Sequence, residues 1–75
     1  MNKYEPFTRL LEVRKLIGLT REELGERANV DPMTIFSMET GRTNYKDAKL
    51  STLLALCKGL GIKLVQLFPK EKNIA

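Results

Sequence analysis

Residues 20–41, TREELGERANVDPMTIFSMETG, form the stretch around which the rest of this 75-residue chain is organised. Apolar residues recur in the stretch at the spacing of two short helices interrupted at Asn29, so that each helix turns one face towards a shared core. The apolar positions are Leu24, Ala28, Val30, Ile35 and Met38. We therefore expect two helices joined by a tight turn, over residues 21–28 and 32–40.

The residues at the ends of these two helices give each boundary a physical cause. Thr20 is followed three residues later by a glutamate, which is the spacing of a capping box at a helix start. Asn29 tolerates positive φ and suits the turn after the first helix. Asp31 and Pro32 together favour the start of the second helix, and Gly41 favours its end.

On these residues the stretch resembles the helix-turn-helix of the phage-repressor and Cro-like (Xre-type) family of bacterial and phage transcription regulators. The matching residues are Arg21, Leu24, Gly25, Ala28, Asn29, Val30, Ile35, Met38, Glu39 and Gly41. The similarity continues over about residues 7–68. It implies an all-α, lambda-repressor-like DNA-binding domain, a compact bundle of five short helices in which the second and third form the helix-turn-helix.

The length of the chain suits a single domain with a modest core. We expect the core to span about residues 7–68, between a flexible N-terminal arm over residues 1–6 and a C-terminal tail over residues 69–75. No apolar run approaches the about 18 residues of a membrane span, and the first residues lack a signal-peptide core. These features predict a cytoplasmic protein, in a bacterial or phage-infected cell by the resemblance.

The segments outside the motif have apolar patterns of their own. Residues 7–17 predict a helix that directs Leu10, Val13 and Ile17 to the core. Residues 50–60 predict a helix whose core stripe contains Leu50, Leu53, Leu54, Cys57 and Leu60, with Leu56 widening it. Residues 42–49 form the connecting loop, and a last short segment packs back through Leu64, Leu67 and Phe68.

The net charge of +4 is unevenly placed along the chain. Residues 1–39 carry six basic and seven acidic side chains, whereas residues 40–75 carry seven basic and two acidic ones. Because the basic excess begins where the second motif helix ends, it favours a polyanionic partner. With no His and only one Cys, the chain has no recognisable catalytic or metal constellation. We expect no enzyme activity, no cofactor and no small-molecule ligand.

The resemblance also assigns roles to charged and polar residues. Arg14 and Glu39 occupy positions that pair in the family, so we expect an ion pair between the first and third helices. Arg21 occupies a position from which the family commonly contacts a DNA phosphate. The full set of expected phosphate contacts is Thr20, Arg21, Thr40, Arg42, Asn44, Tyr45, Lys46 and Lys49.

The outer face of the helix over residues 32–40 departs from the family pattern. By the resemblance its base-contacting positions are Pro32, Met33, Thr34, Phe36 and Ser37. Because most of these are apolar, they suit thymine methyl groups better than hydrogen bonds to base edges. Two interpretations stay open: the helix enters the major groove of a palindromic, T-rich duplex operator, or Met33 and Phe36 form a patch that binds a protein partner.

The sequence is also compatible with a homodimer. Val65 with Leu54 or Ile74 would supply the contact, and a twofold pair of chains would match a palindromic site. The function predicted from these features is a sequence-specific repressor or Cro-like switch protein.

Overall fold

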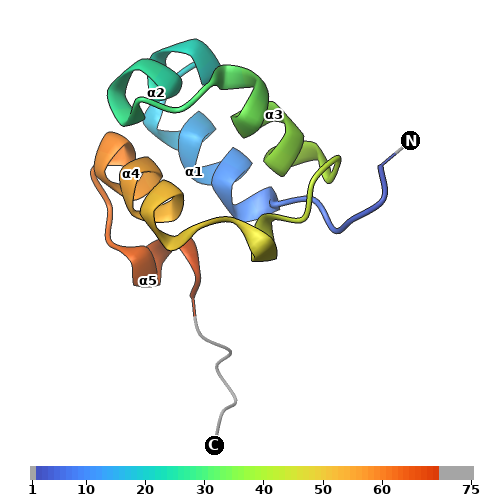
Figure 1. The fold of residues 1–75 in the computed structure, drawn as a ribbon. Helices are drawn as coiled ribbons and strands as arrows, with labels where there is room; N and C mark the ends of the chain where they lie inside the picture. Colours follow the sequence, from blue (N-terminus) through green and yellow to red (C-terminus); the bar gives the residue numbers. More distant parts are fainter. Residues whose placement is uncertain (1, 70–75) are drawn as a thin grey trace, which may run out of the picture.

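The computed structural model describes residues 2–69 of the chain. This part folds as α-helices with no strand, which confirms the predicted all-α bundle of five short helices (Figure 1). The elements in order are α1 (Thr8–Ile17), α2 (Arg21–Ala28), α3 (Pro32–Thr40), the 3-10 helix η1 (Tyr45–Asp47), α4 (Leu50–Leu60) and α5 (Leu64–Leu67).

The helices enclose one apolar core. Figure 1 shows α2 and α3 together at the top, α4 at one side and α5 at the bottom, while α1 lies in the middle and contacts α3, α4 and α5. The most extensive contact between helices is that of α2 with α4. The buried apolar side chains are Phe7, Leu10, Val13, Leu24, Ala28, Ile35, Met38, Leu56, Cys57, Leu60 and Leu67.

The residues predicted to begin and end α2, Thr20 and Asn29, do so in the structure. The Thr20 hydroxyl accepts a hydrogen bond from the Glu23 backbone N–H at 3.0 Å. The Glu23 carboxylate accepts in return from the Thr20 N–H at 2.8 Å, which completes the capping box. Asn29 ends α2 in the left-handed conformation with φ 58°. This single residue reverses the chain towards α3.

The turn between α2 and α3 packs closely onto α2. A Cβ atom at Gly25 would lie 2.6 Å from the carbonyl oxygen of Val30, so a larger residue would push the turn away. Asp31 then begins α3, because its Oδ1 accepts from the Met33 N–H at 2.8 Å. Gly25 and Asp31 therefore fix how α3 sits against α2.

The faces that α1 and α4 bury differ from the predicted ones. Ile17 was expected in the core but is 41% exposed, because the chain turns at the next residue and Leu19 packs against the core instead. On α4, Leu50 and Leu54 were expected in the core but are 59% and 47% exposed. Leu56, expected at the margin of the stripe, is fully buried.

The contact with α2 explains the orientation of α4. A Cβ atom at Gly59 would lie 3.0 Å from Leu24 Cδ1 and 3.4 Å from Ala28 Cβ, so the two helices approach closely at this glycine. This contact turns Leu56 inwards and leaves Leu50 and Leu54 outside.

The N-terminal arm, expected to be flexible, is held against the end of α3. The Tyr4 N–H donates to the Gly41 carbonyl at 2.9 Å, and the Phe7 N–H donates to the Met38 carbonyl at 3.0 Å. Phe7 itself is only 2% exposed and anchors the arm through its burial. The expected C-terminal tail, including Ile74, lies outside the described residues from residue 70 onwards.

Candidate nucleic-acid interface

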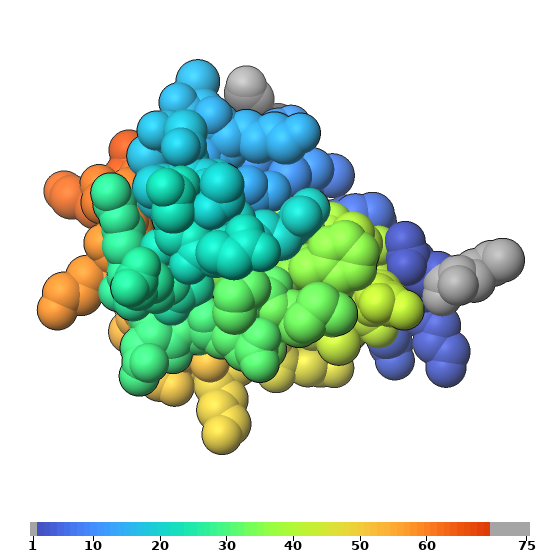
Figure 2. All heavy atoms as spheres, turned by 90° about the horizontal axis from the view of Figure 1, so that it is seen from above, coloured from blue at the N-terminus to red at the C-terminus, as the bar shows by residue number. Residues whose placement is uncertain are grey.

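The outer face of α3 lies next to α2 on one side of the molecule. Figure 2 looks down onto this side and shows α3 in green beside α2 in cyan, with the dark blue N-terminal arm beyond the end of α3. On α3, Met33 is 57% exposed and Thr34 is also exposed. Pro32, Phe36 and Ser37 are half-buried. The residues of α3 that point into the protein are Ile35, Met38 and Glu39.

A shallow hollow of about 270 Å³ opens between α2 and α3 on this face. Pro32, Met33 and Phe36 form its apolar part. Its charged lining consists of Arg21, Glu22 and Asp31. Glu22 and Asp31 at its rim would repel a phosphate placed inside it, whereas the exposed side chain of Met33 can contact a base methyl group. The hollow therefore suits the edge of a base better than the DNA backbone.

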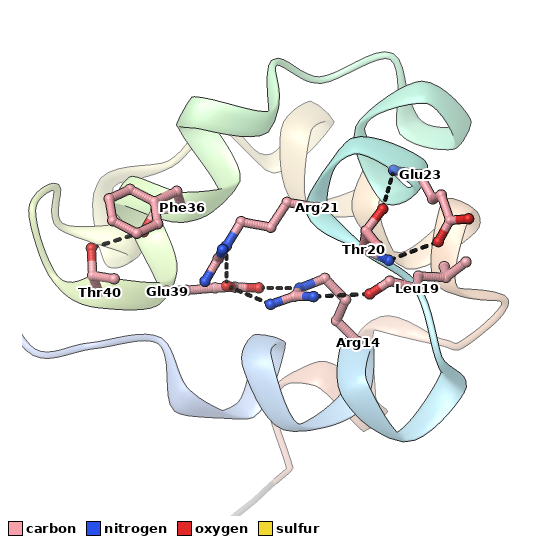
Figure 3. A network of polar contacts seen from close by, with 8 residues as sticks. All are labelled: Arg14, Leu19, Thr20, Arg21, Glu23, Phe36, Glu39 and Thr40. Atoms are coloured by element: carbon pink, nitrogen blue, oxygen red, sulfur yellow. Dashed lines mark hydrogen bonds and ion pairs between the residues drawn. The ribbon is translucent and has the colours of Figure 1, made fainter.

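A buried ion cluster lies directly beneath this face (Figure 3). Arg14 of α1 donates from Nε to Glu39 Oε2 at 2.7 Å and from Nη2 to Glu39 Oε1 at 3.0 Å. Its Nη1 donates to the Leu19 carbonyl at 2.8 Å. Because Arg14 is only 6% exposed and Glu39 only 2%, the pair is shielded from water. The pair connects α1 to the C-terminal half of α3.

Arg21 joins the same cluster from the start of α2. Its Nε donates to Glu39 Oε1 at 2.8 Å, so one carboxylate serves two guanidinium groups (Figure 3). The Arg21 side chain is 35% exposed, in contrast to that of Arg14. The cluster thus carries one excess positive charge, and its partly exposed member faces the side of α2 and α3.

The ring of Phe36 is covered by cations. The guanidinium carbon of Arg21 lies 4.9 Å from the centroid of the ring, and that of Arg42 lies 5.8 Å from it. The sequence predicted Phe36 as an outward base contact, yet the residue is half-buried beside these two arginines. Charged groups attracted to the face of an aromatic ring account for the arrangement.

The two threonines of the expected phosphate set use their hydroxyl groups within the protein. The Thr20 hydroxyl accepts in the capping box of α2. The Thr40 hydroxyl donates to the Phe36 carbonyl at 2.8 Å, within α3. Both oxygens keep a free lone pair or a free proton for a further partner, because a hydroxyl group both donates and accepts.

A second depression of about 600 Å³ lies at the other side of α3, against the loop over residues 42–49. Three residues of the expected phosphate set line it: Arg42, Asn44 and Lys49. The remaining lining is Tyr4, Thr34, Met38, Thr43, Asp47, Ala48 and Thr52. We call this depression the loop groove. It brings the arm, α3, the loop and the start of α4 together.

Two expected phosphate contacts of the loop itself, Tyr45 and Lys46, do not line the loop groove. The ring of Tyr45 stacks on that of Phe7 with centroids 3.9 Å apart, and it lies 6.1 Å from the ring of Phe68. Lys46 extends to Glu5 of the arm, with Nζ 3.1 Å from the carboxylate. The hydrogen bond with Glu5 and its negative charge raise the pKa of Lys46. Both side chains help to hold the arm and the end of the bundle.

The groove also includes residues outside the expected set of phosphate contacts. Thr43 of the loop and Thr52 of α4 line it, and Tyr4 contributes from the arm. Their neighbours along the chain show no pattern that distinguishes them from ordinary loop or helix residues. Tyr4 and Thr52 are distant from Arg42 in the sequence, and only the fold places them in the same depression.

Over residues 2–69, no group of three or more His, Cys, Asp or Glu side chains is arranged to hold a metal ion. No helix in this range is long and apolar enough to cross a membrane.

Comparison with known proteins places these features in a family. The profile of the helix-turn-helix family matches residues 10–67. A similar solved structure is the high-resolution crystal structure of the restriction-modification controller protein C.AhdI from Aeromonas hydrophila, with a TM-score of 0.75. The two chains are 31% identical, and the similarity covers 83% of this chain and 89% of that one. The search of curated proteins found no match.

The chain belongs to the helix-turn-helix family, in the Cro-like (Xre-type) group that its sequence resembles. It is a DNA-binding transcriptional regulator. In such a protein α2 and α3 form the helix-turn-helix, and α3 is the helix that corresponds to the recognition helix.

Proposed function

We propose that this regulator binds a palindromic, T-rich duplex operator as a homodimer and places α3 in the major groove. The observation that carries the proposal is the exposed apolar start of α3, where Met33 is 57% exposed beside the hollow between α2 and α3. In the major groove only thymine among the four bases presents a methyl group, so an apolar contact at this position selects thymine.

The proposed base contacts of α3 are of two chemical kinds, apolar contacts and hydrogen bonds from hydroxyl groups. Pro32 and Met33 line the hollow and offer apolar surface to thymine methyl groups. Thr34 and Ser37 carry hydroxyl groups that can donate to or accept from base edges. The apolar residues alone would not separate guanine from adenine, so DNA shape contributes to the choice of operator.

The phosphate contacts are proposed on both sides of α3. Arg21 and Thr20 at the start of α2 serve one side, where the helix N-terminus adds a favourable partial positive charge. Arg42, Asn44 and Lys49 in the loop groove serve the other side. Thr40 is proposed through the free lone pairs of its hydroxyl oxygen. Tyr45 and Lys46 are weaker candidates, because the ring of Tyr45 and the ammonium group of Lys46 already have partners within the protein.

The homodimer is supported by apolar residues that the fold leaves outside. Leu50 and Leu54 on α4 and Val65 on α5 are 59%, 47% and 57% exposed. Covering them with a second copy removes apolar surface from water. Two chains related by a twofold axis would present two α3 helices to half-sites about 34 Å apart, one DNA turn.

The similarity to a restriction-modification controller protein suggests the setting in which the regulator acts. We propose that it controls an operon of that kind from the cytoplasm of a bacterial or phage-infected cell, by occupying DNA and without catalysis. Repression or activation then depends on where the operator lies relative to the polymerase site.

Selection from a random duplex library tests the operator. We expect enrichment of a palindrome with T-rich half-sites, bound about 10³-fold or more tightly than a scrambled duplex, with a steep dependence on salt. Sedimentation of the saturated complex should show two protein chains for each selected site. If no sequence is enriched, the apolar face of α3 is a protein-binding surface instead; one chain per site would contradict the homodimer.

Replacing thymine by uracil in the selected operator tests the methyl contact at Met33. Loss of one contacted methyl should weaken binding about fivefold or more, since each base contact contributes about 1 kcal/mol or more of discrimination. The variant Met33→Ala should show the same affinity for thymine and uracil operators. Equal effects of uracil on the wild type and on Met33→Ala would place the methyl contact elsewhere.

A further inference from the structure

The ring of Phe36 has an unusual position for a residue on the face that meets DNA. Both Arg21 and Arg42 place their guanidinium carbons over it, at 4.9 Å and 5.8 Å from the centroid. These residues come from different segments, the start of α2 and the residue after the C-cap of α3. One aromatic ring therefore links the two arginines that stand on either side of α3.

Arg21 is held on two sides. Its Nε is bound to the buried carboxylate of Glu39 at 2.8 Å, and its guanidinium plane lies next to the Phe36 ring. Among residues 2–69, Arg21 donates only through Nε, so its Nη1 and Nη2 groups are available to an outside acceptor. A guanidinium group fixed in this way presents the fork that matches a phosphate.

Arg42 has fewer constraints. It is exposed and, within the described residues, it forms no ion pair and its side chain donates no hydrogen bond. Contact with the ring of Phe36 is thus what restricts the orientation of the Arg42 guanidinium group. Without the ring, Arg42 would have to be ordered when DNA binds, at a cost in side-chain entropy.

We propose that Phe36 is a positioning residue: it holds Arg21 and Arg42 ready for phosphates of the operator and makes no base contact itself. The proposal rests on the proposed function and assigns Phe36 a role different from that of Met33. Because phosphates carry no sequence information, Phe36 should affect affinity for all duplexes alike.

The test compares Phe36→Leu with Phe36→Tyr. Leucine keeps an apolar side chain but removes the ring face, whereas tyrosine keeps it. We expect Phe36→Leu to bind both the operator and a scrambled duplex about tenfold more weakly, because both arginine side chains would then have to be ordered when DNA binds. The ratio between the two duplexes should not change, the salt dependence should become shallower, and Phe36→Tyr should match the wild type.

A base-contacting role predicts the opposite pattern. Phe36→Leu would then lose discrimination at defined base pairs and keep its affinity for the scrambled duplex, and this result would overturn the proposal. Met33→Ala is the matched control, because it should lower the preference for the operator and leave binding of the scrambled duplex unchanged. Circular dichroism melting of each variant verifies that the fold is retained.

Two further measurements do not require a selected operator. In the Arg42→Ala background, Phe36→Leu should weaken binding of the scrambled duplex by clearly less than tenfold, because one of the two arginines that Phe36 contacts is absent. In the free wild-type protein, the side-chain Nε–Hε signals of Arg21 and Arg42 should show ring-current shifts in the NMR spectrum. Unshifted signals would contradict the positioning role, even if the protein selects an operator as proposed. Shifted signals without operator selection would refute the proposed function alone.

Discussion

Replacement of Arg14 by methionine is expected to lower the free energy of unfolding by about 3 kcal/mol or more. The reason is burial: Glu39 is 2% exposed, and loss of Arg14 removes two of its three guanidinium hydrogen bonds. Removing one partner of a buried ion pair leaves a charge without compensation and typically costs about 3–5 kcal/mol. The Leu19 carbonyl also loses its donor. Arg21, which still contacts Glu39, keeps the expected loss near the lower end.

Thermal unfolding measures the effect of Arg14→Met. In a domain of this size, about 1 kcal/mol shifts the melting temperature by about 4–8 °C, so a decrease of about 12 °C or more is expected. Lys15→Met is the control, since it removes an exposed charge from the next position of α1 and should stay within about 0.5 kcal/mol of the wild type. The double variant Arg14→Met with Glu39→Met should recover part of the loss, because two apolar residues leave no buried charge. Equal melting of Arg14→Met and Lys15→Met would contradict a stabilising pair.

Replacement of Gly41 by alanine is the second change with a large expected effect, a loss of about 3 kcal/mol. Gly41 ends α3 with φ 84°, and a Cβ atom there would collide with the backbone carbonyl oxygen of Tyr4. The left-handed conformation costs an alanine about 1–2 kcal/mol, and the collision adds a further cost of about 1–3 kcal/mol. The arm would have to leave the end of α3.

Gly61→Ala isolates the contribution of the arm. Gly61 ends α4 with φ 73°, a similar conformation, but a Cβ atom there would meet nothing within 4 Å. We expect Gly61→Ala to lose only the conformational part, about 1–2 kcal/mol. In a chain without residues 2–5, the difference between the two alanine variants in urea unfolding should largely disappear. If it persists in the shortened chain, the arm does not cause it.

The boundaries of α2 and α3 could be predicted from the sequence because their causes are local. Thr20 acts on the residue three positions later, Asp31 on the residue two positions later, and Asn29 on its own backbone conformation. Such interactions form within one helical turn, and no distant part of the chain changes them. The resemblance to a known family added the roles of residues that lie far apart in the sequence.

The faces of the helices could not be predicted in the same way. On α4, apolar residues at Leu50, Leu53, Leu54, Leu56, Cys57 and Leu60 allow more than one apolar stripe. The close approach of α2 at Gly59 selects the stripe with Leu56 and leaves Leu50 and Leu54 exposed. The candidate site shows the same dependence, because Phe36 has Arg21 and Arg42 beside it only once α2 and the end of α3 are in place.

The positions of the helices, the caps of α2 and α3 and the family of the motif thus follow from the sequence, since they depend on residues within a few positions of one another. Packing of the helices controls which apolar residues are buried, how the arm lies against Gly41, and which polar groups remain available to DNA. The physical reason is that burial and charge pairing depend on contacts between distant segments, and those contacts exist only when the helices have packed.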